Sequence, residues 1–265
     1  MKFRRPRRML PRLQGVPVRM VVPNLITLLG LCAGLTAIRF AHQERWEAAV
    51  LAILIAAFMD GIDGRVARLL KGTSKFGEEL DSLADFVNFG VAPAFIVYFW
   101  SLQSVGGPGW AVAVFFAVCT VLRLARFNTF IGQADLPPYA YNFFTGVPSP
   151  AGGGLALLPL MLSFEFGPDV FSLPAVNAAV LVGVGALMIS RLPTFAFKRV
   201  RVPRVMLLPL FLGGALVAAL SLTSLWLMFA ALLGLYLVSI PLSVRSYGIL
   251  KKAADDIRTA PAPQK

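Results

Sequence analysis

Long apolar stretches, separated by short polar or Gly- and Pro-containing segments, dominate the pattern along the chain. An α-helix needs ~20 mostly apolar residues to cross a bilayer, and about eight stretches approach or exceed that length. They predict helices at 22–41, 46–70, 79–103, 109–130, 148–164, 170–191, 204–221 and 225–247. The predicted fold class is therefore all-α: a polytopic membrane helical bundle of about eight transmembrane helices.

Loops rich in basic residues alternate along the chain with loops that are poor in them. One set begins with the N-terminal arginines and continues through Arg65, Lys71, Arg126 and Arg199 to Lys252. The other set is short and poor in base: 42–45, 104–108, 164–169 and 221–224. Because cytoplasmic loops carry an excess of Lys and Arg, this pattern predicts a multi-pass protein of a bacterial-type cytoplasmic membrane, with both termini on the cytoplasmic side.

Composition supports a membrane protein. Of 265 residues, 57% are hydrophobic and only 14% are charged, which exceeds the apolar fraction that a soluble domain can bury. The net charge of +12 lies in the short loops, where it would meet membrane lipid head groups. We therefore expect membrane lipids, and not nucleic acid, as the partners of these basic residues.

Four aspartates stand near the expected cytoplasmic ends of the second and third helices: Asp60, Asp63, Asp81 and Asp85. The members of each pair are three or four residues apart, so each pair lies on one helical face. A turn at 70–75 would bring the two faces together. Clustered carboxylates repel one another unless cations neutralise them, and carboxylate oxygens prefer hard ions. A Mg²⁺ or Mn²⁺ site is expected.

Small residues share these helical faces. Gly64 and Ala67 follow Asp60 by one and two turns, and Gly77 precedes Asp81 by one turn. Small side chains let a ligand approach the backbone closely, and the neighbouring Arg68 offers a planar fork of donors for phosphate. The alternative is an ordinary charged membrane interface. Because acids at membrane depth are costly, four on matched faces favour a functional site for a phosphate ester.

The same residues form a recognisable signature. From Asp60 to Asp85 the sequence reads D-x2-D-G-x2-A-R-x8-G-x3-D-x3-D, which resembles the CDP-alcohol phosphotransferase family at every fixed position. The resemblance implies a core of six helices, often in a homodimer. It also suggests four segments: a basic cytoplasmic segment at 1–21, the membrane core at 22–203, an additional helix pair at 204–247 and a cytoplasmic tail at 248–265.

The resemblance also implies roles for individual residues. Asp60, Asp63 and Asp81 would bind one metal ion, and Asp60, Asp81 and Asp85 a second. Asp85 would also be the catalytic base for the acceptor hydroxyl. The donor CDP-diacylglycerol would be bound by a set of mostly small or polar residues: Asn24, Thr27, Gly64, Ala67, Arg68, Ser74 and Gly77.

Three further stretches resemble the phosphatidylserine synthase branch of the family: 81–93, 122–128 and 144–152. They imply L-serine as the acceptor, with Arg123 and Arg126 near its carboxylate, although basic residues at a helix end are also ordinary membrane anchors. Glycerol 3-phosphate, inositol phosphate and choline stay open as acceptors. A cation transporter is a rival, but its acids would usually lie near the midplane and not at one membrane face.

Overall fold

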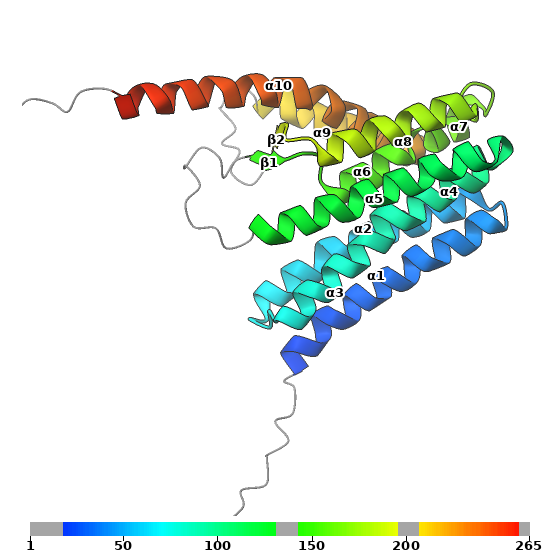
Figure 1. Cartoon of the computed structure of the whole chain (residues 1–265), viewed down its shortest axis with the longest axis horizontal. Helices are drawn as coiled ribbons and strands as arrows, with labels where there is room; N and C mark the ends of the chain where they lie inside the picture. The colour runs from blue at the N-terminus through cyan, green and yellow to red at the C-terminus, as the bar shows by residue number, and fades with distance from the viewer. Residues whose placement is uncertain (1–17, 131–142, 196–206, 260–265) are drawn as a thin grey trace, which may run out of the picture.

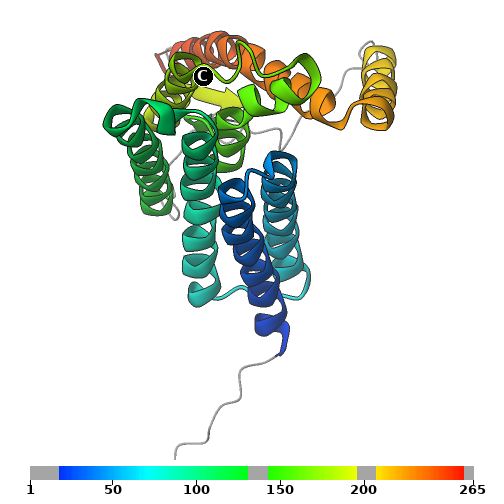
Figure 2. The same ribbon diagram turned by 90° about the vertical axis from the view of Figure 1, so that its right-hand side faces the viewer.

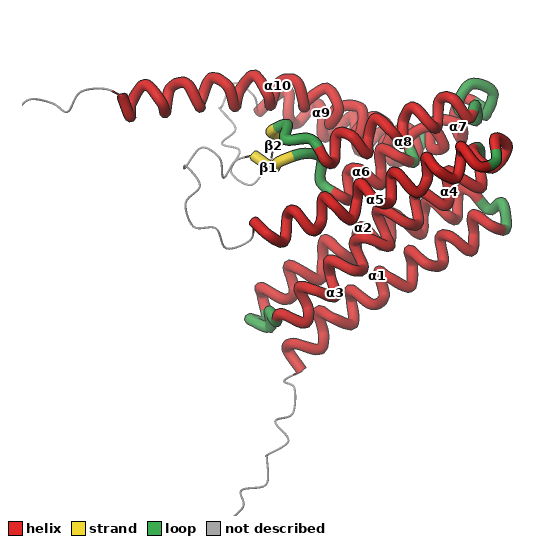
Figure 3. Tube along the Cα trace, viewed as in Figure 1, coloured by secondary structure: helices red, strands yellow, loops and turns green. Residues whose placement is uncertain are grey.

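Helices make up most of the residues that the computed structural model describes, which are 18–130, 143–195 and 207–259 (Figures 1 and 3). The α-helices are α1 (Val18–His42), α2 (Trp46–Leu69), α3 (Lys75–Phe86), α4 (Ala92–Trp100), α5 (Gly107–Phe130), α6 (Ser149–Ala156), α7 (Leu158–Phe166), α8 (Pro174–Ile189), α9 (Leu207–Thr223) and α10 (Leu225–Thr259). Between them lie a π-helix, η1 (Val87–Val91), a 3₁₀ turn, η2 (Leu102–Val105), and two short strands, β1 (Phe143–Thr145) and β2 (Pro193–Phe195).

The bundle is built from long helices that run side by side. α1 packs along α2 and also contacts α3 and α4, while α5 packs against α4 and α8. The start of α1, the α2–α3 turn, the end of α5 and the strand pair all lie toward the left of Figure 1. The segments expected to face the cytoplasm are thus gathered at one end of the bundle.

Four helical segments in the described residues are long and apolar enough to cross a membrane: α1, the continuous run Lys75–Trp100, α5 and Leu225–Leu250 of α10. α2 is as long, but charged residues stand near both of its ends, at Glu47 and from Asp60 to Arg68. The protein is therefore an all-α membrane protein in its main architecture, and the count of eight spans stays a prediction.

Several helix boundaries differ from the sequence prediction by a few residues, and three of the differences follow. The helix expected at 148–164 is interrupted at Leu157, because Pro159 in the next turn has no N–H to continue the hydrogen-bond ladder. The helix expected at 79–103 starts earlier, at Lys75. α10 runs to Thr259, well past the expected end at 247.

A tight turn joins α2 to α3. Lys71 adopts φ 49°, and the N–H of Gly72 closes the end of α2 on the carbonyl of Ala67 at 2.9 Å. The backbone of Gly72 approaches the carbonyl of Arg19 in α1 so closely that a side chain would overlap it. That carbonyl is four residues before Pro23, which has no N–H to bond it within the helix.

The π-helix η1 is the junction of the bundle, where α1, α5 and α6 all converge. Glycines allow these approaches: a Cβ on Gly90 would lie 3.0 Å from Thr120 of α5, and one on Gly153 of α6 would lie 3.0 Å from the Cα of Phe89. π-turns of this kind are often found at functional sites, because they redirect the side chains that precede them.

The strand pair was not expected from the sequence. β1 and β2 are antiparallel, with Phe143 opposite Phe195 and Thr145 opposite Pro193. α10 packs across β2, and Tyr247 of α10 meets the ring of Phe143 at 5.2 Å between centroids. By contrast, α9 packs chiefly against α10 and stands apart from the core (Figure 2).

Candidate active site

The α2–α3 hairpin brings the predicted carboxylates together. Carboxylate oxygens of Asp60, Asp63 and Asp81 all lie within 4.8 Å of one another, although the two helices that carry them are joined by a turn only a few residues long. Asp63 is buried, while Asp60 and Asp81 are partly exposed. Three acidic groups at this spacing are matched to a shared cation, because without one their charges repel.

Asp85, one turn beyond Asp81, completes the group. Its carboxyl lies within hydrogen-bonding reach of Asp60 and is partly buried. All four aspartates line one small recess, together with residues of α1 and η1: Thr27, Gly30, Ala84 and Asn88. The recess is therefore an acidic chamber built by α1, α2, α3 and η1.

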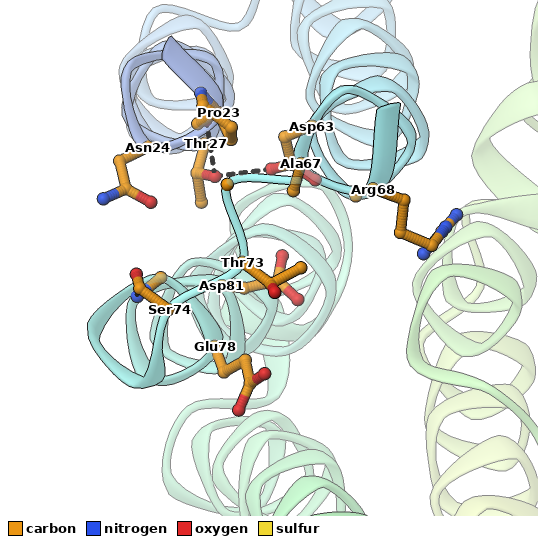
Figure 4. Close-up of a pocket in the computed structure, with 13 residues that line it drawn as sticks. Pro23, Asn24, Thr27, Asp63, Ala67, Arg68, Thr73, Ser74, Glu78 and Asp81 are labelled. Atoms are coloured by element: carbon orange, nitrogen blue, oxygen red, sulfur yellow. Dashed lines mark hydrogen bonds between the residues drawn. The ribbon is translucent and has the colours of Figure 1, made fainter. Parts of the chain in front are cut away.

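Thr27 of α1 holds one of these carboxylates in place. Its hydroxyl lies 2.6 Å from Oδ2 of Asp63, to which it donates, and 3.2 Å from the carbonyl of Pro23 (Figure 4). Thr27 is itself buried. An oriented second partner of this kind fixes the direction of a carboxylate lone pair toward a bound ion.

A wider, more open pocket adjoins the acidic recess and shares Thr27, Asp63 and Asp81 with it. Every residue expected to bind the CDP group lines this pocket: Asn24, Thr27, Gly64, Ala67, Arg68, Ser74 and Gly77. The turn and the first turn of α3 add further residues: Gly72, Thr73 and Glu78. The residues expected to bind the CDP group therefore lie next to the aspartates expected to bind metal.

The start of α3 forms one wall of the open pocket. Ser74 caps the helix, because its Oγ accepts a hydrogen bond from the N–H of Gly77 at 3.1 Å. A Cβ on Gly77 would stand 2.8 Å from Oδ1 of Asn24, so any larger residue here would displace the Asn24 side chain. The helix N-terminus, with its unpaired N–H groups, favours an anionic ligand here.

Arg68 lies on the opposite side of the pocket. Figure 4 shows its side chain extending away from Asn24 and Ser74, beyond Ala67. Arg68 is exposed, and its guanidinium is the cationic group among the residues that line this pocket. Its position suits a ligand that enters between α1 and α3 and extends past α2.

Arg123 of α5 links the acidic recess to α6. One of its guanidinium nitrogens donates to Oγ of Ser149 at 2.6 Å, and the group lies within electrostatic range of Asp85. The guanidinium also stands 5.3 Å from the centre of the Phe127 ring. Of the two arginines expected at the acceptor site, Arg123 is the one that the structure brings to the aspartates.

Arg126 is directed toward backbone carbonyls. Its guanidinium donates to Ile189, to Met188 at 3.2 Å and to Ser190 at 3.1 Å, at the end of α8, and to Thr145 of β1 at 3.0 Å. The last carbonyls of a helix have no partner within the helix, and Arg126 satisfies them. It joins α5, α8 and β1, and its expected contact with the acceptor stays a prediction.

Several residues that line the site were not predicted from the sequence. Thr73 precedes the predicted Ser74, and Glu78 follows the predicted Gly77. Their closeness to these residues in the sequence could have indicated that they line the site. Asn88 lies two turns beyond Asp81 on a continuing helix, so the same face extends to it.

The side chains fit a divalent metal. The donor set consists of carboxylate oxygens with no His or Cys, which is the preference of Mg²⁺ and Mn²⁺. The ordered partner on Asp63 and the burial of the recess are typical of a metal site and not of a solvated acidic face. The acidic cluster can therefore hold a divalent ion beside the open pocket.

Comparison with known proteins agrees with this geometry. The family model described as CDP-alcohol phosphatidyltransferase matches residues 20–235. A Mycobacterium tuberculosis protein named CDP-diacylglycerol--serine O-phosphatidyltransferase is 39% identical over 226 residues, covering 85% of this chain and 79% of its own. A Helicobacter pylori protein of the same name is 34% identical over 231 residues, or 86% of this chain and 90% of its own. A Bacillus subtilis protein of that name is 34% identical over 67% of this chain and 92% of its own. The chain belongs to the CDP-alcohol phosphatidyltransferase family.

Proposed function

We infer that this membrane enzyme transfers the phosphatidyl group of CDP-diacylglycerol to the hydroxyl of L-serine, giving phosphatidylserine and CMP. One observation carries the inference for the donor: the acidic recess and the pocket lined by all seven expected CDP-binding residues share Thr27, Asp63 and Asp81. The serine acceptor is supported by the names of the mycobacterial, Helicobacter and Bacillus relatives.

The proposed metal site holds two ions, Mg²⁺ or Mn²⁺. Asp60, Asp63 and Asp81 would share one, and Asp85 would join Asp60 and Asp81 around the other. When bound, such ions neutralise the diphosphate and stabilise the departing CMP. The protein's contribution is to hold four carboxylates in a fixed, partly dry recess, with Thr27 orienting Asp63 at 2.6 Å.

The transfer itself needs a base for the acceptor hydroxyl, whose proton is weakly acidic. Asp85 is proposed for this role, because it is the last of the four aspartates in the sequence, on α3, and lies within electrostatic range of Arg123. The serine oxygen forms a bond to the lipid-side phosphorus, the bond from that phosphorus to the CMP oxygen breaks, and the serine proton passes to Asp85. CMP leaves with the bonding electrons.

Arg123 is proposed to bind the serine carboxylate. Its guanidinium lies within electrostatic range of Asp85 and donates a hydrogen bond to the Ser149 hydroxyl. A carboxylate held there would place the hydroxyl of a short amino acid beside the proposed base. A planar guanidinium binds a carboxylate in two-point fashion, which an ammonium group does not.

The active site is proposed to face the cytoplasm. The α2–α3 turn, which contains Lys71, lies at the same end of the bundle as the strand pair and the end of α5 (Figure 1), and the aspartates stand on the helices that flank this turn. A site at that interface lets the polar CDP group stay in water while the acyl chains stay in the bilayer. The rule of basic cytoplasmic loops supports this orientation.

A direct test supplies CDP-diacylglycerol, Mn²⁺ or Mg²⁺ and labelled serine to membranes that contain this protein and lack native activity. We expect CMP and labelled lipid, and we expect both to disappear with a chelator and in Asp85→Asn. The matched control is Asp169→Asn, which removes an exposed aspartate from the loop between α7 and α8. That variant should retain full activity.

The acceptor is tested in the same assay. Product from glycerol 3-phosphate, inositol phosphate or choline, with none from serine, would retain the phosphatidyl transfer and reject the serine assignment. Absence of CMP with every alcohol would reject the enzyme activity and favour metal transport, which consumes no CDP-diacylglycerol.

A further inference from the structure

A buried hydrogen bond joins the segments 122–128 and 144–152, which lie on α5 and at the start of α6. Nη1 of Arg123 donates to Oγ of Ser149 at 2.6 Å, and the Ser149 side chain is completely buried. Because water does not reach the serine oxygen to compete for it, such a bond is stronger than one on the surface. One edge of the Arg123 guanidinium is therefore fixed against α6.

Arg123 and Arg126 differ in how many of their N–H groups are used. Arg126 donates to carbonyls at the end of α8 and to the carbonyl of Thr145. Among the described residues, Arg123 donates to Ser149, although a guanidinium carries five N–H donors. The ring of Phe127, whose centre is 5.3 Å from the guanidinium carbon, attracts the cation through its face. A half-buried cation with unused donors is suited to an anionic ligand.

The segment that carries Ser149 is held by bonds to the chain after α8. The N–H of Gly146 donates to the carbonyl of Leu192 at 2.8 Å, and the hydroxyl of Thr194 donates to the carbonyl of Gly146 at 2.9 Å. Pro148, which precedes Ser149, has its φ fixed by its ring. Ser149 is thus a rigid point of attachment for a long arginine side chain, which loses considerable rotamer freedom when it is ordered.

We propose that Ser149 is a positioning residue for the acceptor: it holds one edge of the Arg123 guanidinium, so that the remaining N–H groups are presented to the carboxylate of serine. The proposal rests on the proposed function, because it takes Arg123 to be the residue that binds this carboxylate. Without the bond to Ser149, the arginine would sample several rotamers, and binding serine would have to order it again. Loss of Ser149 should therefore weaken serine binding and leave donor binding unchanged.

The test is steady-state kinetics on the purified full chain, with serine and CDP-diacylglycerol varied separately. In Ser149→Ala we expect the KM for serine to rise roughly three- to tenfold, as for the loss of one hydrogen bond, and the KM for CDP-diacylglycerol to stay at the wild-type value. A KM does not depend on the fraction of folded enzyme, so a variant of lower yield still gives a valid readout.

The matched control is Ser101→Ala. Ser101 is also buried, accepts from Nδ2 of Asn177 at 3.1 Å and donates to the carbonyl of Ser172 at 2.7 Å. It lies just before α5, whereas Arg123 lies near the end of that helix. Ser101→Ala should lower Tm, because it breaks buried hydrogen bonds, and should leave the serine KM unchanged.

A double-mutant cycle separates positioning from a general structural role. Arg123→Leu should raise the serine KM, and Ser149→Ala should have no further effect in that background, which has no donor for Ser149. The proposal is overturned by an unchanged serine KM in Ser149→Ala, by equal changes in both substrate KM values, or by effects of Ser149→Ala and Arg123→Leu that simply add. A serine KM raised as strongly by Ser101→Ala would also overturn it.

Failure of the proposed function gives a different result. In that case the wild-type protein itself would release no CMP, or would release it only with another alcohol. Where the wild type does make phosphatidylserine, the serine KM values of the variants decide the role of Ser149 alone.

Discussion

The hydroxyl of Thr27 on α1 donates to Oδ2 of Asp63 on α2 at 2.6 Å, across the wall between the open pocket and the acidic recess. The same hydroxyl also lies 3.2 Å from the carbonyl oxygen of Pro23 in α1, which can accept from it. A residue of the proposed nucleotide pocket is thereby hydrogen-bonded to a proposed metal ligand. A change in one part of the site can therefore shift the other.

Replacing this hydroxyl should weaken metal binding first. Thr27→Val keeps the shape of the side chain but leaves Asp63 without its partner, and a lost second partner typically lowers metal affinity about 10- to 100-fold. We expect the Mn²⁺ concentration for half-maximal activity to rise by that factor. Thr27→Ser, which keeps the hydroxyl, is the control. An unchanged metal requirement in Thr27→Val would show that the hydrogen bond does not orient Asp63 for metal.

Metal should also stabilise the fold, because it relieves the repulsion among the four carboxylates. At a concentration 100 times the Kd, a ligand stabilises the native state by about 2.7 kcal/mol, which raises Tm by roughly 5–10 °C in a protein of this size. Asp81→Asn should abolish this rise. In a chelator the same variant should melt no lower than the wild type, because it has lost one repelling charge.

Thermal melts of both proteins with and without Mn²⁺ check these expectations. The control is Asp169→Asn, whose Tm should rise with Mn²⁺ as much as that of the wild type. If Asp81→Asn keeps the full Mn²⁺-dependent rise, the aspartates do not form the metal site. A variant that melts lower than the wild type even in chelator would indicate a structural role for Asp81 instead of a ligand role.

Much of the site could be predicted from the sequence because it is local. Asp60 and Asp81 stand on two helices joined by a turn of a few residues, so helical spacing alone brings their faces together. The open pocket follows for the same reason, since Ser74 and Gly77 start the second helix of that hairpin. Asn24 was predicted from resemblance, and α1 lies against both helices.

The rest depends on contacts between segments far apart in the sequence. The strand pair joins 143–145 to 193–195, and its short strands have no clear alternation of their own. Arg123 and Arg126 are three residues apart and look alike as basic residues of one helix end. Only packing decides that Arg123 contacts Ser149 and that Arg126 contacts the end of α8.

Substitutions of the two arginines should therefore have different effects, one on stability and the other on the serine KM. Arg126→Gln removes donors from the last carbonyls of α8, and a hydrogen bond to a charged group is worth about 1.5–3 kcal/mol. We expect a Tm lower by roughly 5 °C, with the serine KM little changed in the remaining folded enzyme. Arg123→Gln should show the reverse: a much higher serine KM and a smaller change in Tm.

Melting curves and serine titrations on both variants form one matched comparison. The assignment fails if Arg126→Gln raises the serine KM as strongly as Arg123→Gln does while its Tm stays at the wild-type value. That result would place Arg126 at the acceptor, as the sequence resemblance suggested.

The packing of η1 against α1 gives the most specific structural prediction. Gly34 is buried against Asn88, and a Cβ at residue 34 would overlap Oδ1 of the Asn88 side chain. Overpacking of this kind costs about 1–3 kcal/mol, so Gly34→Ala should lower Tm by several degrees. Gly183→Ala is the control, because nothing lies near its Cβ and alanine favours a helix by up to about 1 kcal/mol over glycine.

A compensating change makes this prediction sharper. Asn88→Ala removes the overlapping Oδ1, so it should restore Tm when combined with Gly34→Ala, even though each single variant loses stability. Melting curves of the four proteins in the cycle measure the coupling, which should be favourable by roughly 1 kcal/mol or more. Additive losses would mean that the two residues do not meet, and that α1 packs against η1 in another register. In that case Asn88, which lines the acidic recess, would also lie elsewhere relative to Asp85.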